Sequence, residues 1–104
     1  WTVEVLDHGR ERFDIFCAPC HARDGYGDGI VARHGFPMPP SLHSAESHAL
    51  ADDDLLRVIA DGRGKMPPYR ELIPPADQWA IVGYVRALQL SQKPLDTTEG
   101  QVPR

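Results

Sequence analysis

The feature that most constrains this 104-residue chain is the pentapeptide Cys17-Ala18-Pro19-Cys20-His21. Two thiols two residues apart, followed directly by an imidazole, have the C-x-x-C-H spacing of a covalent haem attachment site. In such a site both thiols form thioether bonds to one haem, and the histidine lies under the iron as an axial ligand. The sequence therefore predicts a fold built around one haem c, attached through Cys17 and Cys20, with His21 bound to the iron.

Three other interpretations of the cysteines predict a different site. A tetrahedral zinc site needs four ligands, and this chain has two cysteines, with His34, His43 and His48 outside any zinc-finger spacing. A thioredoxin-like dithiol belongs on a strand-to-helix turn, and no strand pattern precedes Cys17. A plain disulfide would leave the position of His21 unexplained. The haem interpretation uses all three side chains of the motif.

Apolar periodicity predicts an all-α fold with three main helices, over residues 2–16, 52–61 and 75–90. The first helix carries Gly9 on the same face as Phe13. A glycine inside a helix costs about 1 kcal/mol relative to alanine, so we expect a second helix to pack closely against Gly9. We also expect Gly62 to end the second helix and Pro75 to begin the third.

Glycine and proline interrupt the chain between these helices. Residues 22–50 are predicted to be mostly loop, because they contain several glycines and the run Phe36-Pro37-Met38-Pro39-Pro40. The last residues are polar and hold two further prolines. We therefore expect one haem domain over residues 1–91 and a polar C-terminal tail over residues 92–104.

Charge and hydropathy exclude some partners. The formal net charge of -4 argues against nucleic acid, since phosphate binding requires an excess of lysine and arginine. No apolar run approaches the length of about 20 residues that a membrane span needs. The chain begins at Trp1 rather than at a methionine, which is compatible with a leader, a lipid anchor or a membrane tether ahead of these residues.

From residue 3 to about residue 91 the chain resembles the class I monohaem cytochromes c. The matching residues are Gly9 and Phe13, the C-x-x-C-H motif, a glycine-rich loop, Gly64-Lys65-Met66-Pro67, and Tyr84 in the last helix. The resemblance implies that the first and last helices cross in close contact at Gly9 and Tyr84. Residues 10–40 resemble, more narrowly, the monohaem cytochrome subunit of bacterial alternative complex III.

The sixth iron ligand is predicted to be Met66. Its loop follows the second helix, is stiffened by prolines and has the separation needed to cover the haem face opposite His21; the resemblance points to the same residue. The alternatives are Met38, which is close to His21 in the chain, a histidine, or an open site. Arg63 and Lys65 are candidate partners for the haem propionates, with solvated loop charges as the alternative. The Trp79 indole is another candidate donor, although we expect core packing for it.

Ligation by His21 and Met66 would leave no open position on the iron, so we expect an electron carrier and not an enzyme. The expected partners are respiratory complexes, a quinol-oxidising complex as donor and a haem-copper oxidase as acceptor. The resemblance implies haem attachment outside the cytoplasm, hence the periplasm or the outer face of the cytoplasmic membrane. The alternatives are a haem module of a larger redox enzyme or complex, and a five-coordinate gas-sensing or peroxidase-like domain.

Overall fold

The computed structural model describes residues 1–35 and 37–91. Its helices are α1 (Val3–Phe16), α2 (Ala18–His21), α3 (Ile30–Arg33), α4 (Ala45–Ala49), α5 (Asp52–Asp61) and α6 (Pro75–Ser91). None of the described residues lies in a strand, so the all-α prediction is confirmed, and α1, α5 and α6 are the three predicted main helices. The predicted tail over residues 92–104 falls outside the described residues.

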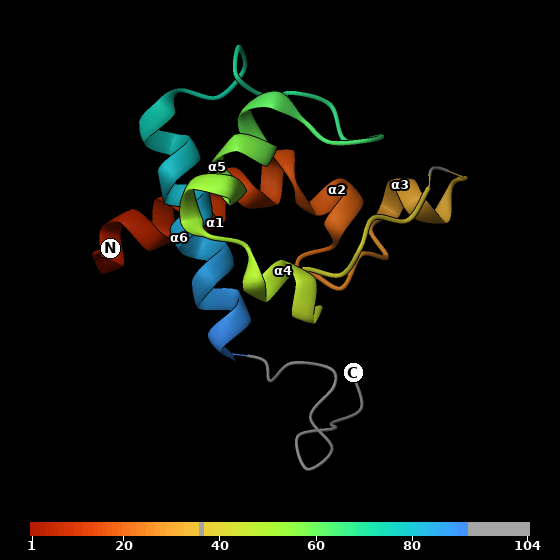
Figure 1. Cartoon of the computed structure of the whole chain (residues 1–104), viewed down its shortest axis with the longest axis horizontal. Coiled ribbons are helices and arrows are strands. Elements are labelled where there is room, and N and C mark those ends of the chain that lie inside the picture. Colours follow the sequence, from red (N-terminus) through yellow and green to blue (C-terminus); the bar gives the residue numbers. More distant parts are fainter. Residues whose placement is uncertain (36, 92–104) are drawn as a thin grey trace.

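Helices α1 and α6 cross, as Figure 1 shows. The crossing lies at Gly9, where a methyl group built on the backbone would come within 2.1 Å of the Ala80 carbonyl oxygen and 3.2 Å of Tyr84 Cβ. One turn further along α1, the Phe13 ring packs on the Tyr84 ring with their centroids 5.2 Å apart. The predicted close contact of the first and last helices is therefore confirmed, and it depends on the absent side chain of Gly9.

The hydrophobic core lies between α1, α5, α6 and the segment that joins α5 to α6. Its buried members include Phe13, Leu55, Ile59, Ile73, Ile81, Val82 and Val85. The predicted core packing of Trp79 is wrong, because its side chain is 38% exposed. The buried face of α6 passes instead through the neighbouring residues Gln78, Ala80 and Ile81.

Pro75 and Gly62 lie at helix boundaries as predicted, and Thr2 provides a cap that was not predicted. Thr2 caps α1, its hydroxyl accepting a hydrogen bond from Val5 N at 3.2 Å, and Pro75 is the first residue of α6. Gly62 ends α5 in the left-handed region, with φ +77°. The predicted loop over residues 22–50 contains only the short helices α3 and α4 among its described residues. No described helix is both long enough and apolar enough to cross a membrane.

His43 fixes the loop that follows α2. His43 is completely buried. Its Nε2 lies 2.6 Å from the Asp24 carbonyl oxygen, and its ring packs on Tyr26 with centroids 4.4 Å apart. Since a carbonyl can only accept, Nε2 must carry the proton. His43 is therefore a hydrogen-bonding residue that holds this loop together.

Candidate functional site

The C-x-x-C-H motif forms a single helical turn directly after α1. Cys17 N donates to the Phe13 carbonyl oxygen at 2.8 Å, which closes α1. The Cys17 carbonyl oxygen then accepts from Cys20 N at 3.1 Å and from His21 N at 2.9 Å, which forms α2. Pro19 lies in the first turn of α2, where a proline has no hydrogen bond to lose. The two thiols and the imidazole are thus carried by one short rigid element.

The glycine-rich loop holds α2 in place. Ala22 leaves α2 with φ +64°, a left-handed conformation that is rare for a residue with a side chain. The chain then folds back, so that Gly27 N donates to the His21 carbonyl oxygen at 2.9 Å and Gly29 N to the Cys20 carbonyl oxygen at 3.1 Å. A side chain at Gly29 would meet a carbonyl oxygen of α2 at 2.3 Å. This segment was predicted only as a loop. The structure shows that it also holds α2 in place through these two backbone hydrogen bonds.

Burial sets the protonation of the motif. Burial raises the pKa of Cys17 to about 12, with the neighbouring Cys20 as a further cause. Burial also lowers the pKa of His21, so its imidazole is neutral at neutral pH. Redox-active dithiols depend on a lowered thiol pKa, which Cys17 does not have. These properties do not match a thioredoxin-like site.

The donor set of this turn fits a haem. The Nδ1 atom of His21 is buried and has no hydrogen-bond partner in the described part of the chain. A neutral imidazole can bind a metal through one ring nitrogen, while the N–H of its other nitrogen donates a hydrogen bond to an acceptor. No such acceptor lies near Nδ1 in the described residues. Within residues 1–35 and 37–91, no three histidine, cysteine or acidic side chains gather in a way that could hold a bare metal ion. A four-ligand zinc site therefore has too few donors here, whereas a haem brings four nitrogen donors of its own.

The segment that carries Met66 is fixed to the start of this turn through Tyr69. The Tyr69 hydroxyl donates to the Phe16 carbonyl oxygen at 3.3 Å, and the two rings meet edge to face with centroids 6.1 Å apart. Burial, and then the nearby Cys17 and Cys20, raise the pKa of Tyr69. Sequence reasoning missed this contact, because nothing in the Met66-Pro67-Pro68-Tyr69 run points to Phe16.

The other candidate residues are more exposed. Met66 is half-buried, whereas Met38 is 61% exposed. Arg63, Lys65 and His34 are all exposed. The structure therefore brings Cys17, Cys20 and His21 together on one turn. It connects the Met66 segment to the start of that turn through Tyr69, whereas Met38 is mostly exposed to solvent.

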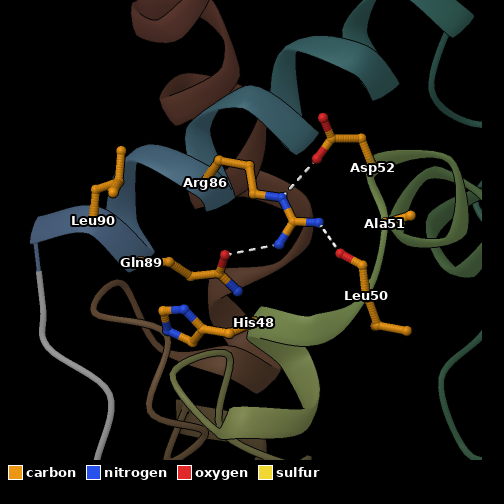
Figure 2. A pocket seen from close by; sticks show the side chains of 7 residues that line it. All are labelled: His48, Leu50, Ala51, Asp52, Arg86, Gln89 and Leu90. Carbon is orange, nitrogen blue, oxygen red and sulfur yellow. Dashed lines mark hydrogen bonds and ion pairs between the residues drawn. The ribbon is translucent and has the colours of Figure 1, made fainter.

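One pocket of the structure lies away from the motif. It measures about 520 Å³ and is lined by residues of α4, α5 and α6, among them Arg86. Figure 2 shows that the Arg86 guanidinium spans it, donating to Asp52 Oδ1 at 2.7 Å, to Gln89 Oε1 at 2.9 Å and to the Leu50 carbonyl oxygen. Gln89 is itself buried and donates to the Leu42 carbonyl oxygen at 2.8 Å. Arg86 thus ties α6 to the segment between α4 and α5.

Replacing Arg86 with leucine is expected to lower the free energy of unfolding by about 2 kcal/mol, because Leu50 and Gln89 lose a charged donor in a partly buried place. Arg57→Leu is the matched control. Arg57 is exposed, its contact with Asp54 is 3.8 Å, and its loss is expected to cost no more than about 0.5 kcal/mol. Denaturant unfolding of both variants checks this, and equal losses would contradict it.

Comparison with known proteins gives a consistent picture. The model of the family described as "Cytochrome C oxidase, cbb3-type, subunit III" matches residues 4–85. One similar solved structure is a chain of the Kuenenia stuttgartiensis reducing HAO-like protein complex Kustc0457/Kustc0458, with a TM-score of 0.70 and 22% identity. It covers 84% of this chain, and this chain spans 44% of its length. No curated protein matches.

A second similar structure is the KustC0563 c-type cytochrome. It has a TM-score of 0.65 and 25% identity, and the match covers 78% of this chain and 96% of that one. The crossing of α1 and α6, the C-x-x-C-H turn after α1 and these matches agree with one another, and the family implies covalently bound haem c. The chain therefore belongs to the family described as cytochrome c oxidase, cbb3-type, subunit III, and its fold is that of a class I cytochrome c.

Proposed function

We propose that this chain is an electron carrier that holds one haem c through Cys17 and Cys20, with His21 and Met66 as the axial ligands. The observation that carries the proposal is the single turn of α2, which presents both thiols and a half-buried imidazole whose buried Nδ1 has no partner in the described residues. The Tyr69 contact to Phe16 supports Met66 as the second ligand, because it fixes the methionine segment beside that turn.

The proposed mechanism requires little movement of the protein. When bound, the haem supplies a one-electron ferric/ferrous couple. His21 and Met66 would both bind the iron and so leave no open position for oxygen or substrates. The Met66 thioether favours the ferrous state and so raises the reduction potential. The hydrogen bonds from Gly27 N and Gly29 N to carbonyl oxygens of α2 would keep His21 in one position in both redox states.

The proposed partners are a quinol-oxidising complex as donor and a haem-copper oxidase as acceptor, in the periplasm or at the outer face of the cytoplasmic membrane. The family description, which names a cytochrome c oxidase, supports the acceptor. The narrower resemblance to the cytochrome subunit of alternative complex III remains a prediction.

A second candidate function is a haem module within a larger redox complex. It is favoured by the Kuenenia stuttgartiensis chain, which belongs to a protein complex and of which this chain spans only 44%. In that case the same His21/Met66 site would pass electrons within one assembly. The full reading frame and the mass of the natural protein distinguish a separate carrier from a module.

The ferric protein is expected to show the weak far-red charge-transfer band of methionine bound to haem iron. Met66→Ala should abolish this band and let the ferrous protein bind carbon monoxide, because the sixth position opens. Met38→Ala is the matched control and should keep the band, since Met38 is 61% exposed. Optical spectra of the oxidised and the dithionite-reduced protein make the measurement.

The opposite result would identify a different protein. If the wild-type protein lacks the band and binds carbon monoxide at once, the sixth position is open, and gas sensing or peroxide chemistry replaces electron carriage. If Met38→Ala and not Met66→Ala removes the band, the ligand assignment is wrong while the carrier function stands.

A further inference from the structure

The residue that ends α5 is in direct contact with the methionine segment. Gly62 N donates to the Val58 carbonyl oxygen at 2.8 Å, which closes α5, and its φ of +77° turns the chain back. The next residues form a tight turn, in which Arg63 N donates to the Met66 carbonyl oxygen at 3.1 Å and Met66 N to the Arg63 carbonyl oxygen at 2.9 Å. The backbone of Met66 is thereby folded onto the end of α5.

There is no room for a side chain at Gly62. A Cβ atom built there would lie 2.5 Å from the Met66 carbonyl oxygen, 2.9 Å from the Pro67 carbonyl carbon and 2.9 Å from Pro68 N. Since Cβ atoms essentially never approach other heavy atoms closer than 3.0 Å, the Met66-Pro67 peptide would have to move by about half an ångström or more. All three contacts are backbone atoms, so no rotation of a side chain can relieve them.

The chain on the far side of Met66 is also fixed. Tyr69 N donates to the Ile59 carbonyl oxygen at 3.0 Å and Arg70 N to the Ala60 carbonyl oxygen at 3.1 Å. Pro67 and Pro68, between these bonds and Met66, restrict the backbone further. Met66 therefore lies between the end of α5 and the hydrogen bonds of Tyr69 N and Arg70 N. A side chain added at Gly62 would displace Met66 itself.

We propose that Gly62 is a positioning residue for the Met66 thioether: its missing side chain lets the Met66 peptide lie against α5, where the methionine reaches the haem iron. This inference rests on the proposed His21/Met66 ligation. The bond between iron and a neutral thioether depends on placement within a fraction of an ångström, and the packed core beneath the segment does not deform to follow it.

The same turn offers a matched control. Gly64 has φ +58°, so alanine there also lies at positive φ, but nothing lies within 4 Å of a Cβ atom built on it. Gly62→Ala and Gly64→Ala thus both place a side chain at positive φ and differ in the contact with the Met66 peptide. Gly62 also has ψ 174°, a conformation that strains any side chain, so stability is measured separately from ligation. Gly62→Asn adds a third case, with a polar side chain that keeps the same Cβ contact.

The test compares the haem-containing variants by the far-red methionine band and by the affinity of the ferric protein for imidazole, with denaturant unfolding as a separate measure of stability. Gly64→Ala should keep the band and the wild-type imidazole affinity. Gly62→Ala and Gly62→Asn should lose or weaken the band and bind imidazole at least tenfold more tightly. A tenfold change corresponds to about 1.4 kcal/mol taken from the iron-thioether bond. Haem should remain attached in all three variants.

Three outcomes overturn the inference in distinguishable ways. If the wild-type protein shows the band and Met66→Ala loses it, but the Gly62 variants keep it with an imidazole affinity within twofold of Gly64→Ala, Gly62 only ends the helix and the proposed function stands. If the wild-type protein has no band, the proposed ligation fails and the role of Gly62 fails with it. A loss of stability at Gly62 without a change in imidazole affinity also counts against positioning.

Discussion

Gly9→Ala is expected to lower the free energy of unfolding by about 2–4 kcal/mol, against a typical total of about 5–15 kcal/mol for a domain. The added methyl would lie 2.1 Å from the Ala80 carbonyl oxygen, so α1 and α6 must separate. That separation loosens the packing of Phe13 on Tyr84 and of the buried side chains beneath it. Alanine gains about 1 kcal/mol of helix propensity over glycine, which offsets only part of this cost.

Gly83→Ala in α6 is the control. It also replaces a helical glycine with alanine, but it does not disturb the contact between Gly9 and the Ala80 carbonyl oxygen. A methyl group at Gly83 would meet the Trp1 ring at 2.8 Å, but Trp1 is the first residue and its side chain is 57% exposed. Because the Trp1 ring can rotate away, the free energy of unfolding is expected to change by no more than about 1 kcal/mol. Guanidinium unfolding of the haem-containing variants, followed by far-ultraviolet circular dichroism, makes the measurement. Equal stability of both variants would mean that α1 and α6 do not meet as closely as the structure has them.

The importance of Gly9 could be predicted because it breaks a local rule. A glycine in the interior of a good helix is costly by itself, so its presence indicates a compensating contact elsewhere. The C-x-x-C-H motif is similar, since three functional side chains within five residues define a site without knowledge of the fold. Both inferences need only local sequence. The fold class followed from the same kind of information, the spacing of apolar residues in α1, α5 and α6.

The features that sequence reasoning missed depend on contacts between distant segments. Tyr69 lies 53 positions from its acceptor at Phe16, and no local pattern indicates that pairing. The complete burial of His43 follows from the way the loop after α2 closes over it. Gly62 was predicted to end a helix, and that is confirmed; its contact with the Met66 peptide requires the three-dimensional path of the loop. Trp79 was misplaced because apolar periodicity assigns a residue to a helix face without fixing how deeply its side chain is buried.

Replacing both Cys17 and Cys20 with serine is expected to abolish covalent haem attachment. Serine keeps the size and most of the shape of cysteine, but its hydroxyl does not form the thioether bond to a haem vinyl group. The purified wild-type protein should retain its haem through acid-acetone extraction and on a denaturing gel stained for haem, and the double variant should release all of it. Each single variant should retain haem through one bond, and its pyridine haemochrome band should lie at longer wavelength, because one vinyl group stays conjugated with the ring.

Ala18→Ser is the control for this experiment, since it introduces the same hydroxyl into the same turn of α2 and leaves both thiols in place. It should retain haem as the wild-type protein does, with an unshifted haemochrome band. If the double variant still holds haem under denaturing conditions, a group outside the motif makes the bond and the proposed attachment is wrong. If Cys17→Ser shifts the band and Cys20→Ser does not, only Cys17 is bonded. The thiol of Cys20 would then be free beside the haem, and the turn of α2 would hold the cofactor from its buried end alone.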